Sequence, residues 1–229
     1  MKILIDGDPY AYRAAFSKES KTEDDAIELV DDLLNNTLYE VDPFHTEEDY
    51  TIFLTGKGNF RFDVAVSHPY KGTRQSEKPE FLGCIRDHMI DNWSAVVSEG
   101  EEADDLIGIS STDYYPDCVV VSIDKDMLQL PGTNYNPVTH KWTEVSKFDG
   151  LKFFYQQILT GDKSDNIIGL HGVGPKKSEK MLEECETEDD LWNAVVNAYD
   201  GDLDRIIENA RLLWLRRYPE QMWEPPDET

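Results

Sequence analysis

The sequence is short of positive charge. It contains 22 Lys and Arg against 47 Asp and Glu, which gives a formal net charge of −25. No Lys or Arg occurs between Thr22 and Gly56. Broad nonspecific binding to DNA depends on neutralising phosphates with many basic side chains, so this composition argues against it. The stretch without bases is best explained as a solvated face turned away from any polyanion.

Cysteine and long apolar runs are also scarce. The three cysteines are scattered, without a C-x-x-C spacing, which argues against a disulfide framework or a zinc site. No apolar run approaches the roughly 20 residues that cross a bilayer. The N-terminal MKILIDGD meets an aspartate too early for a signal peptide. We therefore expect a cytoplasmic protein with reduced thiols and no membrane partner.

Apolar runs and helical patterns alternate through the first part of the chain. Strands are predicted at 2–6, 50–55, 94–98 and 118–123, and helices from Pro9, Thr22, Pro79 and Glu101. This alternation predicts an α/β fold with a doubly wound, mostly parallel sheet. NYNP and KWTEV would add an edge hairpin, and the pattern becomes helical after about Lys147. We divide the chain into an α/β domain (1–146), a helical subdomain (147–218) and an acidic, Pro-rich tail (219–229).

Acidic residues recur where these predicted elements begin or end. Any one pair would be read as a helix cap or a solvated turn. Because ligands of open α/β sheets bind beyond the carboxyl ends of the strands, the groups together predict one anionic site. Oxygen ligands without His or Cys favour two Mg²⁺ or Mn²⁺ ions. The predicted metal ligands are Asp6, Asp8, Glu102, Asp104, Asp105, Asp124, Asp126, Asp162 and Asp165.

The few bases gather in two places. The first is GKGNFRFDVAVSHPYKGTRQSEK, which contains Lys57, Arg61, Lys71 and Arg74. The second follows the turn GLHGVG and contains Lys176 and Lys177. A glycine turn before a helix exposes backbone amides that suit a phosphate, and adjacent lysines add charge. An acidic body with two basic patches can still bind a nucleic acid.

Five stretches in this order resemble the 5′-nuclease superfamily: ILIDGDPYAYR, NFRFDVAVSHPYKGTR, EEADDLIG, VVSIDKDMLQL and LTGDKSDNIIGLHGVGPKK. That superfamily includes flap endonucleases, the 5′-nuclease domain of bacterial DNA polymerase I and, most similar here, small phage 5′→3′ exonucleases. The resemblance implies a PIN-like twisted sheet flanked by helices, with a helix–hairpin–helix-like (H3TH) motif in the helical subdomain. A phage-encoded protein would act in the host cytoplasm.

The resemblance also implies a function. We expect a divalent-metal-dependent 5′→3′ exonuclease, a monomer, that acts on DNA with 5′ ends, nicks or gaps. Flap endonuclease activity and action on RNA–DNA hybrids stay open.

Individual roles follow by position. Lys71 and Arg74 are implied to contact the scissile phosphate, with Asp6 and Asp124 as metal-binding catalytic residues. Gly172, Val173 and Gly174 match the helix–hairpin turn, which in relatives can hold a monovalent cation such as K⁺. Tyr10 and Arg13 match residues that stack on or clamp the displaced strand.

One departure and three alternatives accompany this interpretation. Relatives usually carry an Asp after the second strand, where this chain has Thr55 and Gly56. A catalytically weak or inactive DNA-structure-binding protein of the same fold is therefore one alternative. A haloacid-dehalogenase-like phosphatase, with Asp6 as nucleophile and Asp8 as acid/base, is another. It leaves EEADD, SIDKD and GVGPKK unexplained. A PIN-type ribonuclease is the third.

Overall fold

The computed structural model describes residues 1–73 and 78–226, so Arg74 lies outside the described residues. The chain forms two compact units. The first contains the described residues of 1–58, 76–127 and 132–144. The second contains those of 59–75, 128–131 and 145–229. The segments 59–73 and 128–131 therefore group with the helical part of the chain, whereas the sequence placed them in the α/β domain.

The first unit is built on a six-stranded sheet in the order β3-β2-β1-β4-β5-β6. The neighbours β3-β2, β2-β1, β1-β4 and β4-β5 are parallel, which confirms the mostly parallel sheet. The predicted hairpin forms the edge pair β5 and β6. The strands are β1 (Lys2–Asp6), β2 (Tyr50–Lys57), β3 (Val96–Glu99), β4 (Cys118–Val121), β5 (Gly132–Asn136) and β6 (Lys141–Val145).

Helices of the first unit begin close to the predicted positions. Thr22 caps α2 by accepting from the Asp25 amide, as its place before an acidic first turn predicts. Helix α4 begins at Leu82 rather than at Pro79. A short 3₁₀ helix, η1 (Lys125–Gln129), follows β4. The α-helices are α1 (Asp8–Ala15), α2 (Glu23–Val41), α4 (Leu82–Trp93) and α5 (Ala103–Tyr114).

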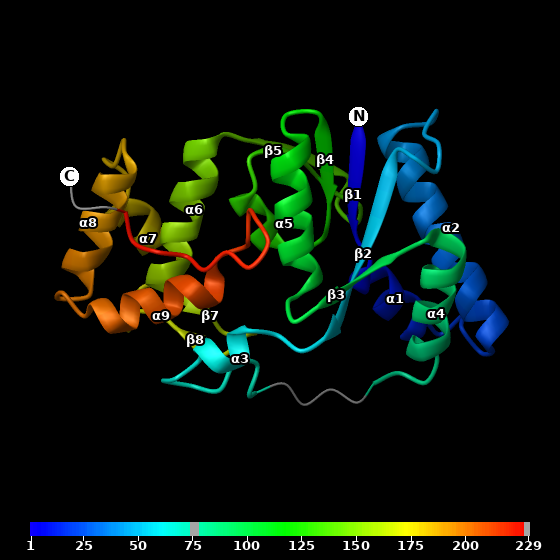
Figure 1. Ribbon diagram of the computed structural model, residues 1–229, viewed down its shortest axis with the longest axis horizontal. Coiled ribbons are helices and arrows are strands. Elements are labelled where there is room, and N and C mark those ends of the chain that lie inside the picture. Colours follow the sequence, from blue (N-terminus) through cyan, green and yellow to red (C-terminus); the bar gives the residue numbers. More distant parts are fainter. Residues whose placement is uncertain (74–77, 227–229) are drawn as a thin grey trace. The chain divides into compact units, whose positions relative to one another are not determined.

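Both faces of the sheet in the first unit are covered by helices (Figure 1). Ile3 and Ile5 of β1 belong to a core shared with apolar residues of α1, α2 and α4. Leu4 between them is equally buried and points to the opposite face because strand side chains alternate. Helix α5 packs against β1, β2 and β4. A sheet buried on both faces explains why the strands are continuous apolar runs.

The second unit is helical, as the sequence predicts after Lys147. Its core contains Phe154, Ile158, Leu191, Val195 and Ile206. A two-residue antiparallel pair, β7 with β8, lies between α6 and α7. The elements are α3 (Arg61–Val64), α6 (Lys147–Thr160), β7 (Gly161–Asp162), β8 (Ile167–Ile168), α7 (Pro175–Met181), α8 (Glu188–Ala198) and α9 (Leu203–Leu213).

The C-terminal segment is attached to the second unit as far as the structure describes it. Trp223 is buried, with its ring centroid 5.7 Å from that of Phe154 and 5.9 Å from that of Trp192. Arg211 donates from Nε to the Trp223 carbonyl at 3.1 Å and pairs with Glu224 at 2.6 Å. An apolar anchor followed by an ion pair thus attaches the described part of the acidic, Pro-rich tail to the second unit.

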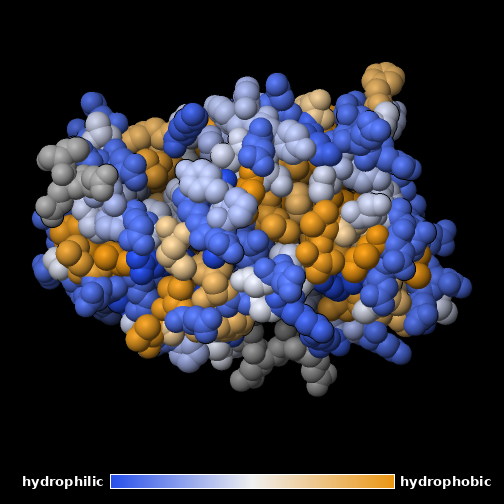
Figure 2. All heavy atoms as spheres, viewed as in Figure 1, coloured by the Kyte–Doolittle hydropathy of each residue, from blue (hydrophilic) through white to orange (hydrophobic). Residues whose placement is uncertain are grey.

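The surface reflects the highly charged composition. Figure 2 shows a face on which hydrophilic residues predominate and hydrophobic residues gather in several patches. None of the helices within 1–73 and 78–226 has the length and apolar character needed to cross a membrane.

Candidate active site

Asp6 is the residue on which the acidic cluster of the first unit is centred. It ends β1, and its side chain is buried, with 5% of its surface exposed. Ser122, directly after the neighbouring parallel strand β4, donates from Oγ to Asp6 Oδ2 at 2.8 Å. The same hydroxyl accepts from the Asp124 amide at 3.0 Å. The ends of β1 and β4 are therefore joined through one serine, as expected for a site at the carboxyl edge of a parallel sheet.

The charge of Asp6 is destabilised by its surroundings. Burial raises the pKa of the Asp6 carboxyl from 3.8 to about 7, and repulsion from Asp8 and Asp124 acts in the same direction. The hydrogen bond from Ser122 only partly offsets these effects. A carboxyl with so high a pKa in a polar cluster is a marker of a functional site. A nearby cation would restore the ionised form.

Helix α5 supplies the second group of acids. Glu102 is its N-cap residue and forms a capping box with Asp105, whose Oδ2 accepts from the Glu102 amide at 3.2 Å. Asp105 is fully buried and Asp104 is half-buried. Burial, followed by repulsion from Asp6 and Asp124, raises the pKa of Asp104 well above its usual range. Asp104 thus lies within electrostatic reach of acids that precede it by nearly a hundred residues and follow it by twenty.

Asp8 and Asp126 have partners of their own. The Asp126 amide donates to Asp124 Oδ1 at 2.9 Å, which fixes the turn that begins η1. Asp8 forms an ion pair with Arg86 through Oδ1, and its Oδ2 accepts from the Thr55 amide at 3.0 Å. Both oxygens of Asp8 are therefore engaged by the chain itself. Its role as a metal ligand stays a prediction.

The donor chemistry of the first unit fits a hard divalent cation. Buried carboxylates that repel one another offer the oxygen ligands that Mg²⁺ and Mn²⁺ take. Across residues 1–73 and 78–226, no group of three or more His, Cys, Asp or Glu side chains is already arranged to hold a metal ion. The fit therefore rests on charge and chemistry, and the individual ligands remain predictions.

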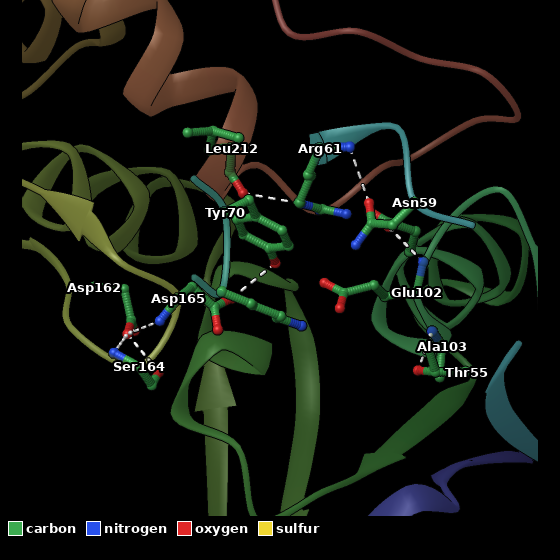
Figure 3. A network of polar contacts seen from close by, with 12 residues as sticks. Thr55, Asn59, Arg61, Tyr70, Glu102, Ala103, Asp162, Ser164, Asp165 and Leu212 are labelled. Atoms are coloured by element: carbon green, nitrogen blue, oxygen red, sulfur yellow. Dashed lines mark hydrogen bonds and ion pairs between the residues drawn. The ribbon is translucent and has the colours of Figure 1, made fainter. Parts of the chain in front are cut away.

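Asp162 ends β7 of the second unit, and Asp165 lies in the turn that leads to β8. Asp162 Oδ1 accepts from the Ser164 amide at 2.7 Å, from the Asp165 amide at 3.3 Å and from the Ser164 hydroxyl (Figure 3). Asp165 Oδ2 accepts from the Tyr70 hydroxyl at 2.8 Å. The approach of these two acids to those of the first unit stays a prediction.

The basic segment around Lys71 is attached to this turn. The Lys71 amide donates to the Asp165 carbonyl at 2.9 Å, and Lys71 Nζ lies 3.9 Å from the Asp165 carboxylate. Asn166 Nδ2 donates to the Pro69 carbonyl at 2.9 Å. Lys71 has a φ of 53°, an uncommon conformation for a residue with a side chain. The structure therefore joins two stretches that the sequence assigned to different domains.

Two residues that the sequence assigned to the nucleic-acid interface are buried instead. Tyr10 is buried in the first unit and donates to Thr37 Oγ1 at 3.0 Å. Arg61 is 2% exposed and donates from Nε to the Leu212 carbonyl at 2.9 Å (Figure 3). Its Nη2 donates to the Trp214 carbonyl at 2.8 Å. Side chains packed in a core and bonded to their own unit cannot reach a DNA strand.

The other predicted contacts with nucleic acid are on the surface. Arg13 lies in the last turn of α1 and Lys57 ends β2, and both are exposed. The turn 172–174 stands between β8 and α7, with Gly172 at a φ of 71° and Gly174 as the N-cap of α7. Lys176 and Lys177 are exposed in the first turn of that helix. The chain between α6 and α7 thus has the predicted order of helix, hairpin and helix.

Sequence reasoning missed three residues that organise these groups. Ser122 stands between the fourth strand and Asp124, so its position at a strand end was a usable signal. Tyr70 precedes Lys71 directly. Arg86 is the one arginine of α4, and its charge within a partly apolar helix indicates a specific partner.

The fold resembles those of solved structures at low sequence identity. The chain superimposes on the 5′-exonuclease of T5 with bound zinc at a TM-score of 0.70 and 17% identity, covering 93% of this chain and 88% of that one. Flap endonuclease-1 from Methanococcus jannaschii gives a TM-score of 0.59 at 12% identity, covering 96% and 79%. These likenesses confirm the PIN-like fold class.

Sequence comparison defines the family. The model for the 5′-3′ exonuclease N-terminal resolvase-like domain matches residues 1–157, and the chain belongs to this family. DNA polymerase I of Bacillus subtilis (strain 168) is 31% identical over 235 residues, which cover 91% of this chain and 26% of that protein. DNA polymerase I of Bacillus caldotenax is 30% identical, with the same coverages. The chain spans about a quarter of the length of these relatives.

Proposed function

We propose that this protein is a divalent-metal-dependent nuclease that hydrolyses phosphodiesters in the 5′→3′ direction at 5′ ends, nicks or gaps of duplex DNA. The observation that carries the proposal is the mutual repulsion of Asp6, Asp104 and Asp124 at one edge of a parallel sheet. Membership of the 5′-3′ exonuclease family supports it. Solved structures of the same fold include a T5 flap endonuclease with DNA and metal ions, which supports DNA and metal as ligands here.

The acids of the first unit would hold the cations. Two Mg²⁺ or Mn²⁺ ions would activate the attacking water and neutralise the scissile phosphate. Within the chain, Ser122 orients Asp6, and the capping box orders the first turn of α5, which carries Asp104. Asp162 and Asp165 of the second unit would complete the ligand set.

The bases would position the DNA. Lys71 would stabilise charge that develops on the phosphate, which is the role that a preorganised cation fills in phosphoryl chemistry. The turn 172–174 would present its amides to a phosphate further along the strand, with Lys176 and Lys177 beside it and K⁺ as an additional bridge. Arg13 and Lys57 are further candidates for phosphate contact.

A panel of labelled substrates tests this function. Duplex, nicked, gapped, flapped and RNA–DNA hybrid substrates, labelled at either the 5′ or the 3′ end, would be incubated with Mg²⁺, Mn²⁺ or EDTA and the product lengths resolved. We expect short products from the 5′ end in either metal and none in EDTA. A covalently closed circular duplex is the matched control, because it has no 5′ end. Cleavage of that circle, digestion from 3′ ends or activity in EDTA would contradict the proposal.

A second candidate is a DNA-structure-binding protein with weak or no cleavage. The observation that favours it is Thr55 at the position where the resemblance expects an Asp. The same panel separates the two, because this candidate would bind nicks or flaps in Mg²⁺ and Mn²⁺ without shortening them. The family match leaves no support for the haloacid-dehalogenase-like phosphatase.

A further inference from the structure

Three elements of the first unit meet around Arg86. Its guanidinium pairs with Asp8 through Nη1 and donates from Nη2 to the Thr55 carbonyl at 2.6 Å. The Thr55 amide in turn donates to Asp8 Oδ2 at 3.0 Å. Arg86 comes from α4, Asp8 from α1 and Thr55 from β2, so the three residues form a closed ring of contacts between separate elements. The planar, two-pronged guanidinium can hold a carboxylate and a carbonyl at the same time.

Thr55 extends this ring to α5. Its Oγ1 accepts from the Ala103 amide at 3.1 Å (Figure 3). Ala103 is the first residue of α5, and the first amides of a helix have no partner within the helix. A side chain from β2 therefore supplies a partner to the helix whose first turn carries Asp104 and Asp105.

Gly56, the residue after Thr55, connects the end of β2 to the segment before α5 through a second set of hydrogen bonds. The Gly56 amide donates to Ser98 Oγ at 3.0 Å, and that hydroxyl donates to the Glu101 carbonyl at 2.6 Å. A Cβ on Gly56 would lie 1.9 Å from the Ser98 carbonyl oxygen, so only glycine allows this approach. The end of β2 is thus held tightly against the segment that leads into α5.

We propose that Arg86, Asp8 and Thr55, which we call the Arg86 clamp, are positioning residues for the metal site. The clamp fixes the first turn of α5 so that Asp104 stays opposite Asp6 while the acids repel one another. Thr55 then has a different task at the position where the resemblance expects an Asp: it holds α5 and leaves cation binding to the neighbouring acids. This inference rests on the proposed function, because it assigns a role within that site.

A purely electrostatic account makes the opposite prediction. Arg86 is a positive charge near the acidic cluster, and it occupies Asp8, which could otherwise bind a cation. Removal of Arg86 would then favour binding of a divalent ion. If the clamp positions the ligands, removal of Arg86 weakens that binding, because residues that orient metal ligands typically contribute about 10- to 100-fold to affinity. The two accounts therefore predict opposite changes in the affinity for a divalent ion when Arg86 is removed.

The test measures Mn²⁺ binding to the full chain without DNA, by isothermal titration calorimetry. Arg86→Gln and Thr55→Val should each weaken binding about tenfold. Arg86→Lys should weaken it similarly, because an ammonium keeps the charge but cannot reproduce the two-pronged geometry. Thr55→Ser, which retains the hydroxyl, should restore affinity close to that of the wild type. Cleavage by Thr55→Val should recover at high Mn²⁺, with an unchanged KM for DNA.

Each result has one meaning. Unchanged or tighter Mn²⁺ binding in Arg86→Gln, or unchanged binding in Thr55→Val, overturns the clamp while wild-type binding and cleavage leave the proposed function intact. A wild-type chain that neither binds Mn²⁺ nor cleaves DNA in its presence overturns the proposed function and the clamp with it. If Arg86→Gln does not fold, as judged by circular dichroism, the uncharged pair Thr55→Val and Thr55→Ser decides the matter.

Discussion

The first unit and the second unit both contain acidic residues at or just after strand ends, but the surroundings of these carboxylates differ between the two units. At the end of β1, Asp6 is buried among other acids, and Ser122 is its one described side-chain donor. At the end of β7, Asp162 accepts from two amides and a hydroxyl, and in the turn that follows, Asp165 has Tyr70 and Lys71 beside it. The acids of the second unit are stabilised by the chain, whereas Asp6 and Asp104 are destabilised by it.

This difference separates carboxylates that the chain itself satisfies from carboxylates whose charge favours a bound cation. A turn that satisfies its own carboxylates is stable without a ligand. A cluster that raises the pKa of its members lowers the stability of the fold unless a cation is bound. The raised pKa values of Asp6 and Asp104 therefore support the proposed cation site more directly than the presence of aspartate alone.

The largest expected effect would come from removing charge in the first unit. The double variant Asp124→Asn with Asp126→Asn should lower cleavage at least about a thousandfold, which corresponds to about 4 kcal/mol of transition-state stabilisation. DNA binding in EDTA should be unchanged or tighter, because less negative charge faces the phosphate. Single-turnover cleavage and fluorescence anisotropy measure the two properties.

The control for that variant is Asp32→Asn with Asp91→Asn, which removes the same charge from exposed positions on α2 and α4. It should cleave like the wild type. Full activity in Asp124→Asn with Asp126→Asn would show that the acidic cluster does not hold the catalytic metal, and the contrast between the units would lose its functional meaning.

The next largest effect concerns the backbone that shapes the turn of the second unit. Gly161 has a φ of 68°, and a Cβ there would lie 2.3 Å from the Ile167 carbonyl oxygen and 2.3 Å from the Gly169 amide nitrogen. Gly161→Ala should lower the free energy of unfolding by about 3 kcal/mol, because strain and overlap add. Chemical denaturation followed by fluorescence would measure it.

Gly172→Ala is the matched control for this prediction. Gly172 has a similar φ of 71°, but open space surrounds the position that its Cβ would take. Its substitution should cost only about 1 kcal/mol. Equal losses in the two variants would mean that the close approach of β7 to β8 contributes nothing to the stability of the turn.

Neutralising one acid in each unit should change the free energy of unfolding in opposite directions. The pKa of Asp6 is about 7 in the fold against 3.8 ordinarily, so protonation stabilises the fold at low pH and this contribution is lost as pH rises through 7. Asp6→Asn in EDTA should therefore raise the free energy of unfolding by about 2 kcal/mol near pH 8 and by much less near pH 4.

Asp165→Asn should do the reverse in the second unit. It weakens the acceptor for Tyr70 and removes the charge beside Lys71, so it should lower the free energy of unfolding by about 1 kcal/mol. Urea denaturation of both variants at the two pH values provides the comparison. Destabilisation by Asp6→Asn near pH 8 would refute the contrast between a repelling cluster and a satisfied turn.

The smallest expected effect is on the affinity for DNA. Lys176→Glu with Lys177→Glu should weaken binding to a nicked duplex about tenfold and reduce the salt dependence by roughly one phosphate contact per lysine. Cleavage at saturating DNA should change little. Titrations at several salt concentrations measure the slope. Lys18→Glu with Lys21→Glu, at exposed positions between α1 and α2, reverses the same charge and serves as the control. An equal loss in both variants would indicate a general charge effect.

Much of the fold followed from local patterns. The apolar runs predicted at 2–6, 50–55 and 118–123 contain the strands β1, β2 and β4, with β4 ending at Val121, because a sheet covered on both faces needs continuous apolar segments. Thr22 begins α2 because its hydroxyl satisfies a free amide. The family could also be predicted from the sequence, since five motifs in a fixed order are far more specific than any one of them.

The residues of the candidate site could be predicted only in part from the sequence. The positions of Asp6, Asp104 and Asp124 at element ends predicted their convergence, because parallel strands place their carboxyl ends at one edge. Tyr10 and Arg61 looked equally suited to contact DNA, yet both are buried, because exposure depends on packing between residues distant in sequence. The ring of Asp8, Thr55 and Arg86 joins three elements and has no local signature.

The sequence by itself determined the order of strands and helices, the edge of the sheet at which the acids gather, and the family. Those properties depend on periodicity, capping and motif order, which are local along the chain. The tertiary structure decided which acids repel and which are satisfied, because the pKa of a carboxyl depends on neighbours that only folding brings close. The partners of Asp6 and Asp165 are separated from them by 116 and 95 residues, respectively.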